Sequence, residues 1–237
     1  MVLATGTVPS VPPVPGLADT PYWTNREAVA TTTLPGSLIV LGGGAIGLEL
    51  GQVFARFRVT VTIVEAADRL LAQEEPEVSE LIARTLQTEG ITVRTGATVD
   101  RTSHDGRRFA LRLVGAELLH AERLLVATGR RVDLTGLGVA SVGIDPGTHA
   151  LAVDDHMRAG DKLWAVGDVT GHGAYTHVAT YQARIAVRDI LQRPGPAADY
   201  QAVPRVTFTD PEIGAVGLTE AQAQECGLNV RTGIGQV

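Results

Sequence analysis

The feature that most constrains the fold is a glycine-rich turn between a short apolar run and a helical stretch. The apolar run at 38–41 ends in the sequence GGGAIG at 42–47, and residues 45–57 have the pattern of a helix. A β-branched run at 59–64 follows and ends at Glu65. Strand, glycine turn, helix and strand within about 30 residues predict a βαβ unit, whose strands are parallel.

The rest of the chain repeats this alternation and predicts an α/β fold. Pro76 opens a helix over 76–89, and Gly90 follows its end. Residues 99–119 alternate in polarity around a hairpin turn at Asp105-Gly106. The remaining expected elements are strands at 91–93, 124–127, 163–166 and 205–208 and a helix at 181–191, with proline-rich linkers at 8–21 and 194–204.

Composition excludes several classes of protein. Hydrophobic residues make up 44% of the 237 residues, too many for a disordered chain, and no apolar run approaches the roughly 18 residues that span a bilayer. The net charge of −6, without a basic stripe, gives no nucleic-acid-binding surface. The start of the chain has no signal peptide, and one cysteine, Cys226, forms no internal disulfide. We expect no membrane partner and a cytoplasmic location.

The glycine turn has the chemistry of a dinucleotide-binding loop. Gly42 permits the tight turn, Gly44 lets a pyrophosphate approach the backbone, and Gly47 lets the helix pack close to the strand. The amides of Ala45 and Ile46 lie at the helix N-terminus, which attracts phosphate. A purely structural turn is the alternative, but the flanking strand, helix and acidic residue favour binding.

Glu65 predicts which nicotinamide nucleotide binds. A carboxylate at this strand end accepts hydrogen bonds from the ribose hydroxyls of NAD and repels the 2′-phosphate of NADP. We therefore expect NADH to be preferred over NADPH. The alternative is that Arg69 turns toward the site and binds that phosphate.

Three further positions have both a structural and a functional interpretation. Glu49 lies in the first helical turn, where a solvated carboxylate is favourable. Gly167-Asp168 ends a strand: such a pair often forms only a turn, but Asp168 can also bind a polyol beside Gly167. His177 begins the next helix, where it caps, packs or faces the ligand of Asp168.

Other catalytic chemistries lack the residues that they need. The six histidines are not spaced with Cys, Asp or Glu as metal ligands, so we expect no metal site. No Gly-x-Ser-x-Gly elbow supplies a hydrolase nucleophile, and Cys226 is expected to be an unreactive thiol at a helix end.

Several motifs in order resemble those of the flavoprotein disulfide reductases, the family of dihydrolipoamide dehydrogenase, glutathione reductase and mercuric reductase. The resemblance extends over nearly the whole chain. It is carried by LATG at 3–6, VPGL at 14–17, GGGAIGLE at 42–49, ATGR at 127–130, AVGD at 165–168, HVA at 177–179, FTDPEIG at 208–214 and VGLTE at 216–220.

The resemblance implies a domain organisation. Residues 1–18 correspond to the end of the first FAD-domain segment, and 19–131 to a Rossmann-like NAD-binding domain inserted in the FAD-binding domain. Residues 132–198 correspond to the second FAD-domain segment, and 199–237 to the start of an α+β dimerisation domain. The intact protein is then a homodimer that passes hydride from NADH to FAD and electrons to a small-molecule acceptor.

The resemblance also implies roles for individual residues. Glu49 matches a glutamate near the flavin that pairs with a lysine, Arg130 an arginine beside the nicotinamide nucleotide, and Asp168 the aspartate that holds the flavin ribityl chain. Ala45 replaces the tyrosine that gates the nicotinamide pocket in glutathione reductase. The other cofactor-binding positions that the motifs imply are Thr5, Gly6, Gly129, Gly167, His177, Val178 and Ala179.

The sequence departs from the family pattern in ways that bear on activity. It lacks the first FAD-binding glycine loop, the Cys-x4-Cys redox pair, the lysine partner of Glu49 and the His-x4-Glu proton acceptor. Arg58 replaces a family glycine in the turn before the second strand. We expect an internal fragment or half of a split protein, not competent alone for disulfide reduction. The alternative is a non-catalytic dinucleotide-binding fragment or subunit.

Overall fold

The computed structural model describes residues 1–235 and divides into two compact units. The first unit comprises Met1–Val8 and Arg130–Arg205, and the second unit comprises Pro9–Gly129 and the chain from Val206 onward. Both units mix helices and strands, which confirms the predicted α/β class. Within residues 1–235, no helix has the length and apolar character needed to span a membrane.

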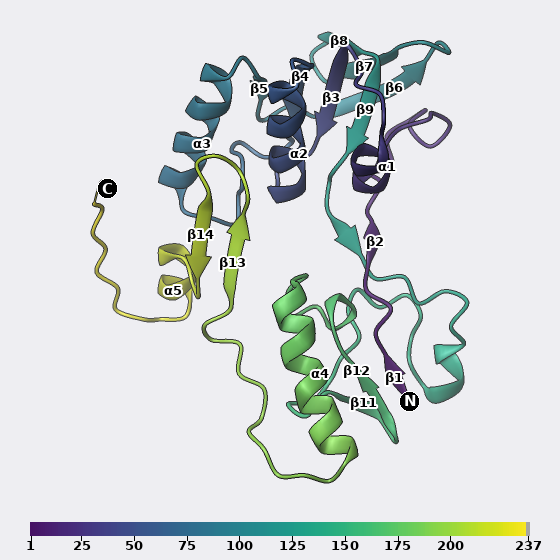
Figure 1. Ribbon diagram of the computed structural model, residues 1–237, viewed down its shortest axis with the longest axis vertical. Helices are drawn as coiled ribbons and strands as arrows, with labels where there is room; N and C mark the ends of the chain where they lie inside the picture. Colours follow the sequence, from purple (N-terminus) through teal and green to yellow (C-terminus); the bar gives the residue numbers. More distant parts are fainter. Residues whose placement is uncertain (236–237) are drawn as a thin grey trace. The chain divides into compact units, whose positions relative to one another are not determined.

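A four-stranded parallel sheet forms the centre of the second unit (Figure 1). Leu41 is in register with Val64 on one neighbouring strand and with Val126 on the other. The carboxyl ends of these three strands therefore lie side by side, where the glycine turn begins. The strands, in the order β5-β4-β3-β9, are β5 (Thr92–Arg94), β4 (Thr60–Val64), β3 (Ser37–Leu41) and β9 (Arg123–Val126).

The two faces of this sheet bury alternate residues of the same strand. Leu38 and Val40 pack with the helices on one face, whereas Ile39 and Leu41 pack with an antiparallel sheet on the other. Alternation follows from the two-residue period of a strand. The helices are α2 (Ala45–Arg56) and α3 (Pro76–Thr88); the antiparallel strands are β6 (Val99–His104), β7 (Phe109–Leu113) and β8 (Leu118–Ala121).

Of the two short helices of the second unit, the first was not predicted, and of the second only the end at Cys226 was expected; each has a sequence signal at its start. Thr24 and Glu27 form a capping box before α1 (Asn25–Ala30), and Thr219 and Gln222 form another before α5 (Glu220–Glu225). Such a box satisfies amides that a helix start leaves unpaired. A hairpin of β13 (Pro204–Thr207) and β14 (Ile213–Val216) precedes α5. Cys226 lies at the end of α5, as expected, and is exposed.

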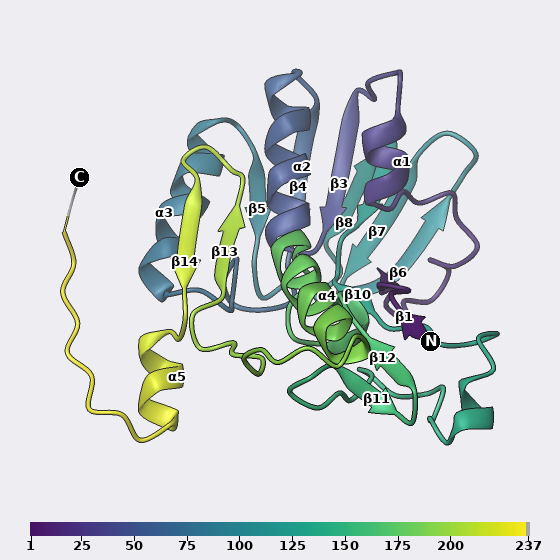
Figure 2. The same ribbon diagram turned by 60° about the horizontal axis from the view of Figure 1, so that its bottom comes forward.

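The first unit has a small sheet covered by a long helix (Figure 2). Strand β12 (Leu163–Ala165) pairs in parallel with β1 (Val2–Leu3) and antiparallel with β11 (Arg158–Gly160). Helix α4 (Thr176–Ile190) begins five residues before the predicted start at 181, because Thr176 to Thr180 continue the same helical face. The remaining elements are β2 (Val8–Pro9), which pairs with β10 (Arg130–Arg131), and the 3₁₀ turns η1 (Val139–Val142) and η2 (Asp168–Thr170).

The boundaries of the compact units and the expected domain boundaries fall at different residues. Leu17 is fully buried in the second unit among Ile39, Phe109 and Leu111, so the chain from Pro9 onward packs with the parallel sheet. The assignment of 1–18, 19–131, 132–198 and 199–237 to cofactor domains remains a prediction.

Candidate functional site

The glycine turn of the second unit depends on the absence of side chains at two positions. Gly42 has a φ of 115°, and a Cβ added there would lie 2.4 Å from the carbonyl oxygen of Ala127. A Cβ added at Gly47 would lie 2.1 Å from the carbonyl oxygen of Gly42. Gly42 therefore makes the turn, and Gly47 brings α2 against it, as the motif predicts.

Gly44 differs from these two glycines because it faces open space. A Cβ added there would meet nothing within 4 Å, and Gly44 is the N-cap of α2 with an ordinary φ of −84°. Among the described residues, no side chain caps this helix start. The amides of Ala45 and Ile46 thus lie at a helix N-terminus that is open to an anion.

Glu65 lies directly beside the glycine turn. Its Oε2 accepts a hydrogen bond of 2.5 Å from the Gly43 amide, and its Oε1 accepts one of 2.7 Å from the Ala67 amide. Each carboxylate oxygen has two lone pairs, so both oxygens keep one for a further donor. The turn and the acidic residue are thereby held in one arrangement.

Both terminal nitrogens of Arg69 donate hydrogen bonds within the second unit. Its Nη1 donates to the carbonyl oxygen of Glu74 at 2.7 Å and to Ser79 Oγ at 2.8 Å, and its Nη2 donates to the carbonyl oxygen of Ala72 at 2.6 Å. The same loop is tied to the glycine turn, because the Leu71 amide donates to the carbonyl oxygen of Gly43 at 3.0 Å. Arg69 therefore orders the loop behind the turn.

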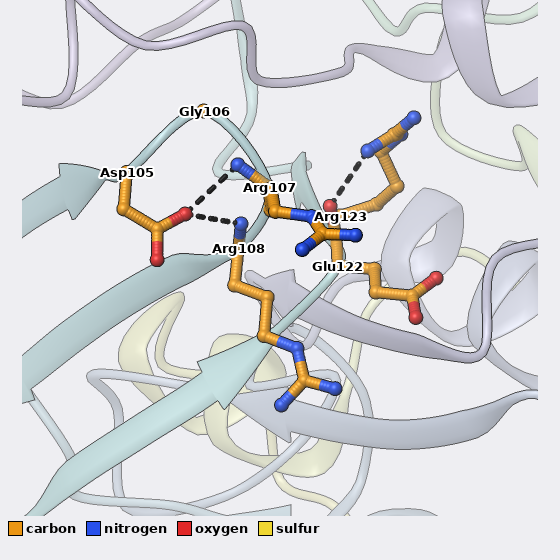
Figure 3. Close-up of a pocket in the computed structure, with 6 residues that line it drawn as sticks. All are labelled: Asp105, Gly106, Arg107, Arg108, Glu122 and Arg123. Carbon is orange, nitrogen blue, oxygen red and sulfur yellow. Dashed lines mark hydrogen bonds between the residues drawn. The ribbon is translucent and has the colours of Figure 1, made fainter.

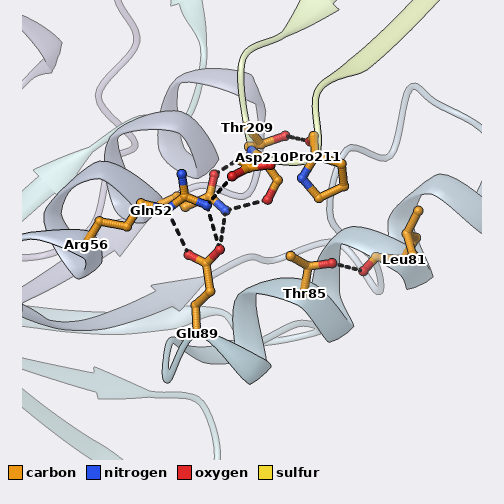
Figure 4. A network of polar contacts seen from close by, with 8 residues as sticks. All are labelled: Gln52, Arg56, Leu81, Thr85, Glu89, Thr209, Asp210 and Pro211. Carbon is orange, nitrogen blue, oxygen red and sulfur yellow. Dashed lines mark hydrogen bonds and ion pairs between the residues drawn. The ribbon is translucent and has the colours of Figure 1, made fainter.

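Glu49 is not free in solvent, in contrast to the simplest interpretation of its position. Its Oε1 accepts a hydrogen bond of 2.8 Å from the Phe208 amide, just beyond strand β13. One turn further along α2, Gln52 is buried and exchanges two hydrogen bonds with the backbone of Asp210. Arg56 then forms ion pairs of 2.8 Å with both Glu89 and Asp210 (Figure 4).

These three side chains make one polar face of α2. Their spacing of three and four residues places Glu49, Gln52 and Arg56 on the same side of the helix. The segment after β13 is held against this face. Gln52 and Arg56 were not singled out from the sequence, although their spacing from Glu49 was visible.

In the first unit, Gly167 and Asp168 follow strand β12. Gly167 has a φ of 82°, and its amide donates to Oε1 of the fully buried Gln182 at 2.6 Å. Gln182 Nε2 in turn donates to Thr170 Oγ1 and to the Tyr200 hydroxyl, each at 2.9 Å. Gln182 thus holds the Gly-Asp turn from behind; the sequence pattern did not indicate it.

Asp168 is linked to the crossing strands of the first unit through Thr7. The Thr7 hydroxyl donates to Asp168 Oδ2 at 3.1 Å and accepts from Arg130 Nε at 2.6 Å. Of the motif residues just before Thr7, Thr5 is exposed and Gly6 has a φ of 66°. In the second unit Gly129, with a φ of 114°, ends the segment that leads to Arg130.

The first turn of α4 contains the three remaining predicted positions. Val178 is buried, and Ala179 lies against Gly167, whose added Cβ would be 3.5 Å from the Ala179 Cβ. His177 is exposed and stacks on Tyr175 with ring centroids 5.4 Å apart. His177 therefore packs against an aromatic ring and does not cap the helix.

A cavity of about 590 Å³ lies elsewhere in the second unit (Figure 3). It is lined by the β6–β7 turn and by Glu122 and Arg123 at the amino end of β9, and no predicted site residue lines it. In open parallel sheets, ligands bind at the carboxyl ends of the strands. The cavity is thus not the dinucleotide site.

Both carboxylates at this cavity are engaged by the backbone. Asp105 Oδ1 accepts from the amides of Arg107 and Arg108, each at 2.8 Å, and these hydrogen bonds lower the pKa of Asp105. Glu122 Oε2 accepts from the Gly36 amide at 2.8 Å. Among residues 1–235, no group of three or more His, Cys, Asp or Glu side chains is arranged to hold a metal.

The fold and the glycine turn define the class of protein: an α/β protein with a Rossmann-like βαβ unit. The chain belongs to the pyridine nucleotide-disulphide oxidoreductase family, which it matches over residues 1–183, and it matches the dimerisation domain of that family over residues 203–237. Members of this family depend on FAD and on a pyridine nucleotide.

Curated relatives are mercuric reductases. The protein from Streptomyces lividans is 39% identical over 236 residues, which cover 98% of this chain and 50% of the relative. The protein from Bacillus cereus is 35% identical over 238 residues, which cover 98% of this chain and 38% of the relative. The chain therefore spans half or less of the length of these oxidoreductases.

Two solved structures illustrate the shared fold. The HOCl-induced flavoprotein disulfide reductase RclA from Escherichia coli superposes with a TM-score of 0.87 at 34% identity, covering 94% of this chain and 52% of RclA. LpdA from Mycobacterium tuberculosis superposes with a TM-score of 0.85 at 26% identity, covering 95% of this chain and 50% of LpdA.

Proposed function

We propose that this chain binds NADH at the glycine turn 42–47 and, in the intact protein, takes part in hydride transfer from NADH to FAD. The observation that carries the proposal is the helix start at Gly44, which no side chain covers or caps among the described residues. The Glu65 carboxylate lies beside it and accepts a hydrogen bond from the neighbouring Gly43 amide. The amides there bind the pyrophosphate, and Glu65 accepts hydrogen bonds from the adenosine ribose.

The surroundings of Glu65 favour NADH over NADPH. A 2′-phosphate would approach a carboxylate that the Gly43 and Ala67 amides hold in place. Arg69, the cation that could neutralise this phosphate, donates instead to loop carbonyls and Ser79. If Arg69 turned its terminal nitrogens toward a 2′-phosphate, the loop would lose these hydrogen bonds.

The first unit supplies the groups proposed for the flavin. FAD carries the redox chemistry when bound, and the chain's own part is to hold it. Asp168 would accept hydrogen bonds from the ribityl hydroxyls. The other positions proposed to line the flavin site are Thr5, Gly6, Gly167, His177, Val178 and Ala179. Arg130 would contact the nicotinamide nucleotide, and Glu49 would lie near the flavin. The electron acceptor is a small molecule, and the intact protein is a homodimer.

Calorimetry with the purified chain tests the glycine turn. NADH should bind to the wild type, and Gly44→Val should lower its affinity at least tenfold, because the new side chain occupies the space proposed for the pyrophosphate. Gly214→Val is the matched control, since a Cβ there also meets nothing within 4 Å, in strand β14. Equal affinity of a folded Gly44→Val protein would contradict the proposal.

Charge reversal tests the ribose assignment. Glu65→Arg should shift the ratio of NADH to NADPH affinity toward NADPH by about tenfold or more, because a repulsive charge is replaced by an attractive one. Glu80→Arg, on the exposed side of α3, controls for the change in net charge. An unchanged ratio in Glu65→Arg would show that this residue does not face the ribose.

The alternative is a dinucleotide-binding chain without catalysis of its own. It is favoured by the single cysteine, Cys226, among the 237 residues given, because these residues by themselves hold no disulfide for a redox step. Flavin absorbance of the purified protein, or reduction of added FAD by NADH, would support the oxidoreductase. Binding of NADH by a colourless protein that does not reduce FAD would support the alternative.

A further inference from the structure

Three segments of the first unit meet at one hydroxyl group, that of Thr7. Arg130 Nε donates to Thr7 Oγ1 at 2.6 Å, and Arg130 Nη2 donates to the Thr7 carbonyl oxygen at 2.7 Å. Thr7 Oγ1 donates to Asp168 Oδ2 at 3.1 Å. Hydrogen bonds thus run continuously from the Arg130 guanidinium through Thr7 to the Asp168 carboxylate. Arg130 and Asp168 lie 123 and 161 positions after Thr7 in the sequence.

The Thr7 hydroxyl can make both hydrogen bonds because it is both a donor and an acceptor. A guanidinium has donors and no acceptor, and an ionised carboxylate has acceptors and no donor. A hydroxyl has one donor and two acceptor lone pairs, so it can accept from Arg130 while donating to Asp168. Because both partners are charged, each hydrogen bond is of the stronger, charge-assisted kind.

Each charged partner keeps a free side for a ligand. Asp168 uses Oδ2 for Thr7, and among the described residues no protein group donates to its Oδ1. Arg130 uses Nε and Nη2, and within residues 1–235 its Nη1 has no acceptor. Asp168 is half-buried and Arg130 exposed, so the unused atoms can reach a ligand.

We propose that Thr7 is a positioning residue that fixes Arg130 and Asp168 relative to each other, so that the two cofactors they hold are aligned for hydride transfer. This inference rests on the proposed function, because it takes Arg130 as the nicotinamide contact and Asp168 as the flavin contact. Thr7 itself need not touch either cofactor. Its hydroxyl sets the orientation of both side chains before binding.

The first arm of the test needs no cofactor. In the ¹⁵N-labelled full chain, the Arg130 Nε–H signal, assigned by its loss in Arg130→Lys, should exchange slowly with water. Thr7→Val keeps the shape and removes the hydroxyl, and should speed this exchange about tenfold. Thr7→Ser retains the hydroxyl and should restore slow exchange. Thr148→Val is the matched control: it removes a hydroxyl that donates to the carbonyl oxygen of Ala150 at 2.7 Å in the same unit.

The second arm measures cofactor binding by the same variants. Titration with FAD and with NADH should show affinities about tenfold weaker for Thr7→Val than for Thr148→Val, with Thr7→Ser close to the wild type. A general loss of stability would affect Thr7→Val and Thr148→Val alike. Rescue by serine and the difference between the two valine variants are therefore the signature of positioning.

The outcomes separate this inference from the proposed function. Slow exchange of the Arg130 Nε–H in Thr7→Val would overturn the inference, as would fast exchange with unchanged cofactor affinities. If the wild type binds neither FAD nor NADH, the proposed function fails, and the exchange arm alone decides whether Thr7 fixes Arg130.

Discussion

The glycine turn of the second unit and the Thr7 cluster of the first unit are built in opposite ways. The turn comes from residues 42–69, and its shape depends on atoms that are missing at Gly42 and Gly47. In the cluster, side-chain hydrogen bonds join Thr7 to two residues that lie 123 and 161 positions further along the chain. The glycine turn is therefore sensitive to added side-chain atoms. The Thr7 cluster is sensitive to the removal of hydrogen-bonding groups.

The largest effect should come from adding atoms to the turn. Gly47→Val would place its Cβ 2.1 Å from the Gly42 carbonyl oxygen, so the helix must move away from the strand. We expect the free energy of unfolding to fall by about 3 kcal/mol, the upper range for overpacking. Urea denaturation measures this, with Gly44→Val as the control that should change stability far less. Similar losses in both variants would contradict the steric account.

An intermediate effect should come from removing hydrogen bonds behind Asp168. Gln182→Leu leaves the buried Gly167 amide without its acceptor and the Thr170 oxygen without its donor, although the Thr170 hydroxyl still donates to the Gly167 carbonyl oxygen. The unsatisfied groups should cost about 2 kcal/mol of stability, seen as a lower urea midpoint. Thr180→Val, an exposed position on the same helix, should change the midpoint little. A stable Gln182→Leu protein would mean that packing, and not hydrogen bonding, holds this turn.

The smallest effect should come from Arg58, a residue with a side chain at a backbone position that favours glycine. Arg58 has a φ of 67°, in the left-handed region that favours glycine, and it replaces a glycine of the resembling family. Arg58→Gly removes strain but gives the unfolded chain more freedom, so we expect a gain of about 0.5 kcal/mol. Thermal unfolding measures the gain, and Arg58→Ala, which keeps a Cβ, should show none. Destabilisation by glycine would show that the Arg58 side chain contributes contacts.

Local pattern was sufficient for much of the second unit. The predicted helix over 45–57 is observed at Ala45–Arg56, the one over 76–89 at Pro76–Thr88, and the hairpin turn lies at Asp105-Gly106 as expected. These elements have strong periodicity and glycine or proline at their ends. Helix α1 has only six residues, too short for periodicity, although its capping box could have indicated it. Of α5, which is equally short, the sequence indicated the end at Cys226 but not the start that its capping box marks.

The first unit contains contacts that the local sequence pattern could not predict. The Gly167-Asp168 turn was visible in the sequence, but Gln182 behind it and Thr7 beside it were not. A glutamine within a helix and a threonine after a glycine have no distinctive spacing. Their roles arise only when the chain brings them next to a buried amide and between two charges.

What the sequence by itself determined is the βαβ unit with its glycine turn and acidic residue, because steric limits on the backbone act between near neighbours. Resemblance of ordered motifs added the family. Only the tertiary structure decided that Arg69 is tied to its own loop, that Glu49, Gln52 and Arg56 hold the segment after β13, and that Thr7 links Arg130 to Asp168. Hydrogen bonds have strict distance and direction, and no sequence pattern reports which distant groups meet them.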